Sequence, residues 1–350
     1  MMDKNRKKQL LWQLPFLTLL VVGTVLIIRQ QHSMPFQYNK GMVFGTLYSI
    51  TYQNDKDLHD EIEAEMKKVD NALSMFNDNS VITSVNQKQT TYIDNSEEGR
   101  MFLEVYNLAM KISKETRGAF DITVAPLVNA WGFGFKESAF PSNETIDSLL
   151  QFVGYQKQSY FEDKKGKGIR KNDSRMMFDC SAIAKGYGTD VVARLLAKHG
   201  VENYMVEIGG EVSTRGINPK RVPWKIGVNK PIEDSLSRND IQTILNVTDR
   251  AMATSGNYRN FYYRGGQKYA HTIDPRTGHP VQHSLLSATV LTDNCATADA
   301  YATAFMVMGI DSAKQFLDNH PELLVYFIYA RPDGNTDVWY SPSLKDKISE

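Results

Sequence analysis

The hydrophobic and polar positions of the chain follow helical spacing in some segments and strand-like alternation in others. Helical spacing predicts four helices, at Ile62 to Met75, Glu98 to Thr116, Ser181 to Lys198 and Ala296 to Met308. Short runs of β-branched and aromatic residues predict strands at Val43 to Tyr52, Tyr204 to Ile208, Trp224 to Val228, Ile241 to Val247, Lys268 to Ile273, Ser287 to Leu291 and Leu324 to Tyr329. The charged segment Glu162 to Ser174 predicts a solvated turn or hairpin. Without repeats or a linker after residue 40, the pattern predicts one α+β domain of mixed sheets and helices at 41–350.

The N-terminal region departs from this pattern. Leu10 to Ile28 form a run of nineteen residues without a charge, which is long enough to cross a bilayer as a helix. Four basic residues precede the run, namely Lys4, Arg6, Lys7 and Lys8. Because Arg29 is the only charge directly after it, we expect a cytoplasmic tail at 1–9, a single-pass anchor at 10–28 and a polar linker at 29–40. The domain then lies on the periplasmic side of the cell inner membrane.

A cleaved signal peptide is the alternative interpretation of this run. The run is long for a signal peptide and no A-x-A-like site follows it, which favours an uncleaved anchor. No cysteine directly follows the run, so a lipoprotein anchor is excluded. The two cysteines, Cys180 and Cys295, also exclude a disulfide-rich scaffold and a multi-cysteine metal site, and they leave a single disulfide open.

The overall charge of the chain does not indicate a class of partner. Forty basic and forty acidic residues cancel, so nothing favours nucleic acid as a partner. Any anionic ligand must therefore be held by a local group of residues.

The segment Asp293 to Ala304 (DNCATADAYATA) predicts an oxygen-rich metal site. Asp299 and Thr303 are spaced i, i+4, so on a helix they share one face. A carboxylate and a hydroxyl are hard oxygen ligands, which suit Mg²⁺ or Ca²⁺ rather than zinc. The alternative is a small-residue helix packed in the core, with Thr303 bonded back to the carbonyl of Asp299.

The segment Asp179 to Asp190 (DCSAIAKGYGTD) predicts an anion site. Ser181 is placed to cap a helix whose first turns contain Lys185, and free N–H groups at a helix start bind anions. The glycine and lysine order of a P-loop is absent. A merely solvated lysine is the alternative.

The segment Tyr269 to Gly278 (YAHTIDPRTG) predicts a strand that presents His271 before a sharp turn. A histidine in this position exchanges protons near neutral pH. The alternative is a plain turn in which Arg276 pairs with Asp274. The histidines do not predict a zinc site, because glycine and proline between them break the helix that a His-x₃-His pair needs.

Two further stretches place backbone where a ligand can approach closely. EIGGE at 207–211 follows a strand, and its paired glycines allow a positive φ. GAFDITVAPLVNAWGFG at 118–134 contains Asp121, which fits a capped turn equally well. Neither stretch decides the function alone.

Together these segments closely resemble the FAD:protein FMN transferase family, the ApbE-type flavin transferases. The resemblance covers most of the chain after residue 40 and keeps the family's motif order. It also includes MVFGTLYSI at 42–50, SMFNDNSVITSVN at 74–86, EIGGEVSTRG and the TSGNY turn. The resemblance implies an ApbE-like domain. The chain departs from the family at Cys180 and Ser181, where many relatives have Leu-Gly, and at Glu207, where many have Asn.

The resemblance also implies the site residues. Mg²⁺ is expected to bind a main-chain oxygen of Ala182 and the side chains of Asp299 and Thr303. The implied contacts with FAD are Met42, Ser74, Met75, Phe76, Asp121, Lys185, Glu207, Thr254, Ser255, Gly256, His271 and Ile273.

The implied reaction moves FMN from FAD to a Thr or Ser hydroxyl of an acceptor flavoprotein and releases AMP. A cation at Asp299 and Thr303 would stabilise negative charge on the leaving group. We expect His271 to take the hydroxyl proton, with Asp299 as the rival base. The outward-facing domain suggests flavoprotein subunits of membrane electron-transfer complexes as acceptors.

Two other functions remain open at this stage. Water in place of the acceptor hydroxyl makes the same site a metal-dependent FAD pyrophosphatase that yields FMN and AMP. A non-catalytic flavin-binding assembly protein would bind FAD without turnover.

Overall fold

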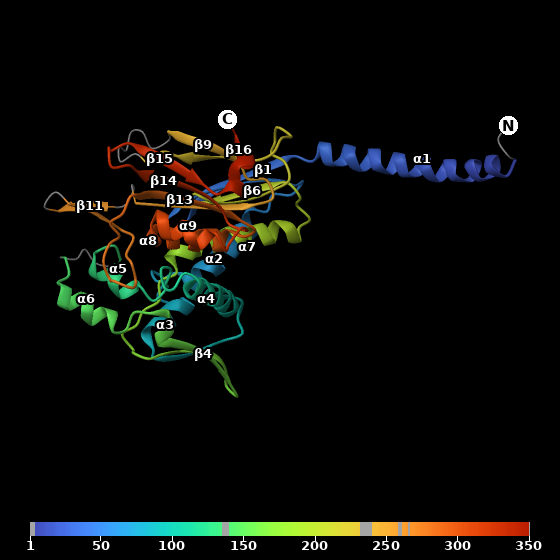
Figure 1. Cartoon of the computed structure of the whole chain (residues 1–350). Coiled ribbons are helices and arrows are strands. Elements are labelled where there is room, and N and C mark those ends of the chain that lie inside the picture. The colour runs from blue at the N-terminus through green and yellow to red at the C-terminus, as the bar shows by residue number, and fades with distance from the viewer. Residues whose placement is uncertain (1–3, 135–139, 232–239, 258–260, 265–266, 350) are drawn as a thin grey trace.

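The computed structural model describes the chain apart from residues 1–3, 135–139, 232–239, 258–260, 265–266 and 350 (Figure 1). The helices in the described residues are α1 (Lys4–Ser33), α2 (His59–Leu73), α3 (Val81–Gln87), α4 (Glu97–Glu115), α5 (Ala125–Ala130), α6 (Asn143–Leu150), α7 (Ser181–Lys198), α8 (Cys295–Met308) and α9 (Ile310–Leu317). Short 3₁₀ turns are η1 (Tyr155–Lys157) and η3 (Pro342–Lys347).

One large antiparallel sheet organises the domain, with strand order β1-β2-β6-β7-β10-β13-β14-β15. Its strands are β1 (Phe36–Val43), β2 (Thr46–Gln53), β6 (Tyr204–Ile208), β7 (Glu211–Arg215), β10 (Ala251–Gly256), β13 (Leu285–Thr292), β14 (Leu324–Ala330) and β15 (Thr336–Tyr340). Three small sheets have the orders β11-β12, β16-β9-β8 and β3-β5-β4. Their strands are β3 (Thr90–Ile93), β4 (Gln158–Asp163), β5 (Gly166–Lys171), β8 (Lys225–Asn229), β9 (Ile241–Asn246), β11 (Phe261–Arg264), β12 (Gln267–Ala270) and β16 (Ile348–Ser349).

The main core lies between one face of the large sheet and the helices that cover it. Figure 1 shows α2, α7, α8 and α9 on one side of the sheet, with β9 and β16 on the other. Phe305 of α8 and Phe327 of β14 are fully buried there, with ring centroids 5.7 Å apart in an edge-on arrangement. Removing either ring would cost about 3–5 kcal/mol, so this layer fixes α8 against the sheet.

The α+β domain predicted from the sequence is confirmed, and several elements agree closely. α7 has the predicted bounds, and the predicted charged hairpin contains the turn between β4 and β5. The single strand predicted from Val43 to Tyr52 is wrong, because Phe44 and Gly45 have φ of 51° and 72° and turn the chain into a β1-β2 hairpin. Residues 36–40 of the predicted linker belong to β1.

The transmembrane segment predicted at 10–28 is not confirmed. Side chains of α1 are described from 13 to 29, and within the described residues no helix has both the length and the hydropathy needed to span a bilayer.

Candidate active site

A cavity of about 960 Å³ lies where α7, α8 and the β6-β7 turn meet. Residues of β8, β10 and the segments at 119–133 and 271–275 complete its lining. Sites for small molecules are concave and typically enclose about 300–1,000 Å³. The fold therefore brings most of the sequence motifs to one large cavity.

Asp299 and Thr303 of α8 both line this cavity, as their i, i+4 spacing predicted. Asp299 is 3% exposed, and its Oδ2 accepts the N–H of Gly186 at 3.0 Å. The hydroxyl of Thr303 lies 3.1 Å from Ser255 Oγ. A carboxylate and a hydroxyl thus face the same space from one side of the helix.

Close contact between α7 and α8 sets the position of this oxygen pair. A Cβ at Gly186 would lie 2.4 Å from the carbonyl oxygen of Cys295, so a glycine is required where the helices meet. Asp190 of α7 accepts the N–H groups of Cys295 and Ala296 at 2.7 and 2.9 Å. Burial raises the pKa of Asp190 to about 6, although both N–H groups oppose that shift. The start of α8 is therefore anchored to α7.

The start of α7 differs from the prediction in one detail. Ser181 does not cap the helix, because the N-cap position is Cys180 and no side-chain cap bond forms there. Instead, Asp179 Oδ1 accepts the N–H of Ser181 at 2.7 Å. Ser181 and Ala182 line the cavity, so the beginning of α7 still faces it.

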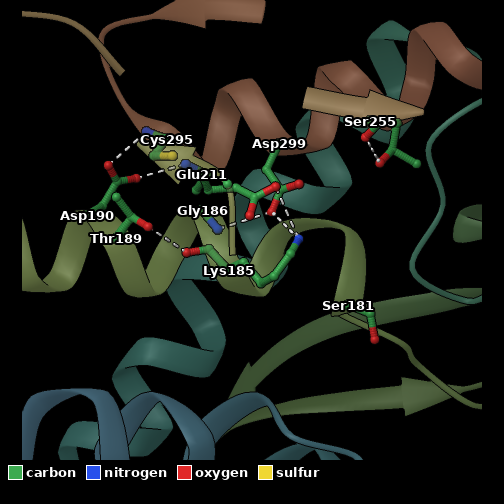
Figure 2. A network of polar contacts seen from close by, with 12 residues as sticks. Ser181, Lys185, Gly186, Thr189, Asp190, Glu211, Ser255, Cys295 and Asp299 are labelled. Atoms are coloured by element: carbon green, nitrogen blue, oxygen red, sulfur yellow. Dashed lines mark hydrogen bonds and ion pairs between the residues drawn. The ribbon is translucent and has the colours of Figure 1, made fainter. Parts of the chain in front are cut away.

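Lys185 supplies the positive charge of the cavity wall. Its Nζ lies 3.3 Å from Glu211 Oε1 and 3.7 Å from Asp299 Oδ2. Burial alone would lower the pKa of Lys185, but the two carboxylates outweigh burial and raise it. Figure 2 shows the ammonium pointing toward both acids. The lysine is therefore held by carboxylates instead of being merely solvated.

Glu211 is a cavity residue that the sequence analysis did not select. It begins β7, directly after Gly209 and Gly210, whose φ values of 63° and 102° form a tight turn. Its side chain is buried, and within the described structure its Oε2 has no hydrogen-bond partner. Burial raises the pKa of Glu211 to about 8, and the Lys185 ammonium opposes that rise. The signal for this residue was a carboxylate immediately after a glycine turn.

Glu207, which the family resemblance selected, lies on the other side of the same turn. Its Oε1 accepts the N–H of Gly210 at 2.9 Å, and burial raises its pKa. Glu207 also lines the cavity, so it stabilises the turn by this hydrogen bond and faces the ligand space.

The predicted residues of β10 and of the 271–275 segment also reach the cavity. The members of this group are Thr254, Ser255, Gly256, His271 and Ile273. The His271 ring stands edge-on to Phe133, with centroids 6.4 Å apart. The alternative pairing of Arg276 with Asp274 is confirmed by two hydrogen bonds of 2.9 and 2.8 Å. This segment therefore contains both predicted features, a cavity-lining His271 and a turn in which Arg276 pairs with Asp274.

Asp121 lines the cavity while its carboxylate is occupied by the protein. Its Oδ1 accepts the N–H and hydroxyl of Thr123 at 2.8 and 2.7 Å, and its Oδ2 accepts the N–H of Tyr155 at 2.6 Å. Burial raises the pKa of Asp121, and these donors oppose the rise. A flavin contact at Asp121 stays a prediction.

Four predicted FAD contacts lie outside the described cavity lining, namely Met42, Ser74, Met75 and Phe76. Met42 and Phe76 are 74% and 71% exposed, whereas Met75 is buried in the main core. Their contact with FAD stays a prediction. Both cysteines are buried free thiols.

Comparisons with known proteins agree on one family. A sequence model of the ApbE family matches residues 44–327. The FAD:protein FMN transferase of Vibrio cholerae is 37% identical over 318 residues, covering 89% of this chain and 92% of that protein. The FAD:protein FMN transferase of Escherichia coli K12 is 30% identical over 321 residues, covering 90% of each.

Solved structures give the same result. The flavin transferase ApbE from Vibrio cholerae superposes with a TM-score of 0.78 at 33% identity, covering 90% of this chain and 99% of that one. The apo form of the flavinyl transferase ApbE of Pseudomonas stutzeri gives 0.79 at 28% identity, covering 90% and 97%.

Proposed function

This chain belongs to the ApbE family, and we propose that it transfers the FMN half of FAD to a Ser or Thr hydroxyl of an acceptor protein with the help of a divalent cation. Transfer of FMN from FAD to a protein is the activity carried by the names of its relatives, so the chain is a transferase. The cation, the hydroxyl acceptor and the release of AMP are the proposed parts.

The observation that carries the proposal is the meeting of Asp299, Thr303, Lys185 and His271 in one cavity. An oxygen pair suited to a hard cation faces a lysine suited to phosphate, and a histidine lies in the same lining. This combination matches the needs of a dinucleotide pyrophosphate and an incoming hydroxyl.

The residues present fit a magnesium ion. Asp299 and Glu211 supply two buried carboxylates, whereas Lys185 supplies one ammonium, so this group carries an excess negative charge when both acids are ionised. No cluster of three His, Cys, Asp or Glu side chains suited to a metal exists in the described part of the chain. The Asp299 carboxylate, the Thr303 hydroxyl and the main-chain oxygen of Ala182 would hold the ion. Mg²⁺ usually binds through one or two carboxylates plus substrate phosphates and waters.

When bound, the cation would neutralise the pyrophosphate and stabilise charge on the departing AMP. Lys185 positions a phosphate at the start of α7, because its ammonium is held at the cavity wall by two carboxylates. His271 accepts the acceptor's hydroxyl proton as the new oxygen–phosphorus bond forms. The bond between the two phosphates breaks, and AMP leaves with the electron pair.

The experiment is a reaction with FAD and MgCl₂, run with and without a flavoprotein acceptor domain. We expect a fluorescent acceptor band in a denaturing gel and one AMP for each labelled acceptor. Release of FMN without a labelled protein would show that the activity is FAD hydrolysis and not transfer. Intact FAD under both conditions would show that the protein does not turn FAD over, as expected of a non-catalytic flavin-binding protein.

We further propose that the domain works on the periplasmic side of the inner membrane, on flavoprotein subunits of electron-transfer complexes. Support comes from the basic residues before the apolar run and from the exposed apolar side chains of α1, such as Leu19 at 77%. Figure 1 shows α1 extending away from the domain. Fractionation of cells into membrane and soluble pools, with protease added to spheroplasts, tests this placement.

A further inference from the structure

We propose that the acceptor protein docks by adding an extended segment to the free edge of β8, which directs its Ser or Thr hydroxyl into the cavity. The inference rests on the proposed function, because it concerns the acceptor of the same reaction. It gives a binding role to a strand that lies outside the sequence motifs of the family.

β8 brings a free strand edge to the ligand space. It is the last strand of the small sheet β16-β9-β8, so in the described structure its other side has no strand beside it. Four of its five residues line the cavity, namely Ile226, Gly227, Val228 and Asn229. The other edge strands with described side chains, β1, β3, β4, β15 and β16, contribute nothing to that lining. Among these strands, β8 is therefore the one whose edge a ligand in the cavity would meet.

The hydrogen bonds of β8 show which backbone groups lie on the free edge. The carbonyl of Trp224, directly before β8, accepts the N–H of Val247 at 3.1 Å, so Trp224 bonds toward the β9 side. In an antiparallel pair the residues that bond to the neighbouring strand alternate. The register shift of this pair adds a residue to β9 and none to β8, so the alternation continues along β8. The N–H and C=O groups of Lys225, Gly227 and Asn229 therefore face away from β9.

The occupant that fits this edge is an extended polypeptide. An added strand lies about 4.7–4.9 Å from its neighbour, and its main-chain hydrogen bonds supply affinity while side-chain pockets supply specificity. Gly227 is exposed and has no side chain, so a second backbone can approach the middle of the edge. The relatives are named for transfer to a protein, and an extended chain is narrow enough to carry a hydroxyl into a cavity of about 960 Å³.

Docking along β8 also selects one hydroxyl. Successive side chains of a strand point to opposite faces, so only alternate side chains of the added segment turn toward the cavity. His271 and Thr303 line the same cavity as β8. A fixed register on β8 therefore presents a single Ser or Thr to the reacting groups.

The first test uses a short peptide copied from the sequence around the labelled hydroxyl of the acceptor, with that Ser or Thr replaced by Ala. The peptide should inhibit acceptor labelling in competition with the acceptor. Methylation of one backbone nitrogen at a time should weaken inhibition about tenfold at every second position and little at the positions between, because alternate N–H groups bond to β8. Equal effects at consecutive positions, or no inhibition by the unmethylated peptide, would overturn the inference.

The second test changes the edge itself. Gly227→Pro removes the central N–H of the free edge, and proline is tolerated in edge strands. The KM for the acceptor should rise about tenfold or more relative to the Kd for FAD, which is measured by flavin fluorescence in MgCl₂. Gly227→Ala is the matched control, because it keeps the N–H and its Cβ meets only the Ile241 side chain, at 3.3 Å. It should keep most of the acceptor affinity.

An equal rise in the KM for the acceptor and the Kd for FAD in Gly227→Pro would overturn the inference, since general damage to the cavity affects both. If the wild type labels its acceptor and neither test behaves as stated, the docking inference alone is wrong. A wild type that only hydrolyses FAD would overturn the transfer proposal, and the docking inference with it, before any variant is made.

Discussion

Replacing Gly186 with alanine tests whether the α7-α8 contact positions the chemistry. The added Cβ would lie 2.4 Å from the carbonyl oxygen of Cys295 and 2.9 Å from Cα of Ala296, both backbone atoms of α8. Ordinary contacts begin at 3.4 Å, so the helices must separate by about 1 Å. That shift moves Lys185 on α7 away from Asp299 on α8.

The two expected effects differ in size. Alanine gains about 1 kcal/mol of helix propensity over glycine, and overpacking costs about 1–3 kcal/mol. Stability should therefore fall only modestly, with a drop of a few degrees in Tm. A displacement of about 1 Å between reacting groups can reduce a rate about 100-fold. We expect the transfer rate to fall by that factor.

The assay is the initial rate of acceptor labelling by in-gel flavin fluorescence, with Tm measured on the same sample. Gly188→Ala is the matched control on the same helix, because its Cβ meets the movable ring of Phe44 at 2.5 Å and not the α8 backbone. Its rate should stay near the wild-type value. A Gly186→Ala enzyme with an unchanged rate would refute the claim that this contact sets the geometry.

The other predictions concern charge, burial and thiols. Asp299→Asn keeps an oxygen acceptor for the Gly186 N–H and removes the charge, so the transfer rate should fall about 100-fold or more and MgCl₂ should no longer raise the Tm; a magnesium-dependent Tm in the variant would contradict this. Burial lowers the pKa of Lys171 to about 8, so between about pH 8 and 10.5 the unfolded chain binds more protons than the folded chain. In that range the free energy of unfolding of the wild type, measured by denaturant titration, should rise relative to that of Lys171→Met by up to about 1.4 kcal/mol per pH unit. A flat difference would show that Lys171 titrates alike in both states. Cys180 and Cys295 are buried free thiols, and burial raises the pKa of each. Iodoacetamide should therefore leave both unmodified in the folded protein and modify both in the unfolded protein, with no reductant needed, as intact mass would show.

Much of the domain could be predicted because local patterns agree with the tertiary structure. α7 matches its predicted bounds and α8 begins one residue early, since caps and helical spacing are properties of the sequence itself. The β1-β2 turn was missed because Phe44, a bulky residue, adopts a positive φ that residue type does not indicate. β7 was missed because it is short and polar, with burial supplied by neighbouring strands.

The site divides in the same way. Asp299 and Thr303 could be paired from their spacing, because a helix places such residues on one face. The contact of Glu211 with Lys185 joins β7 to α7, and no local pattern encodes a contact between separate elements. Ser181 was assigned as a cap from residue type, whereas the preceding Asp179 carboxylate takes the N–H of Ser181 instead. Long-range contacts therefore required the fold.

The most direct measurement is the intact mass of an acceptor flavoprotein domain after incubation with this protein and FAD, in MgCl₂ or in EDTA. The account predicts the gain of one FMN on a single Ser or Thr with MgCl₂, and no gain in EDTA or with Asp299→Asn. An acceptor of unchanged mass beside free FMN, or equal labelling in EDTA, would contradict it.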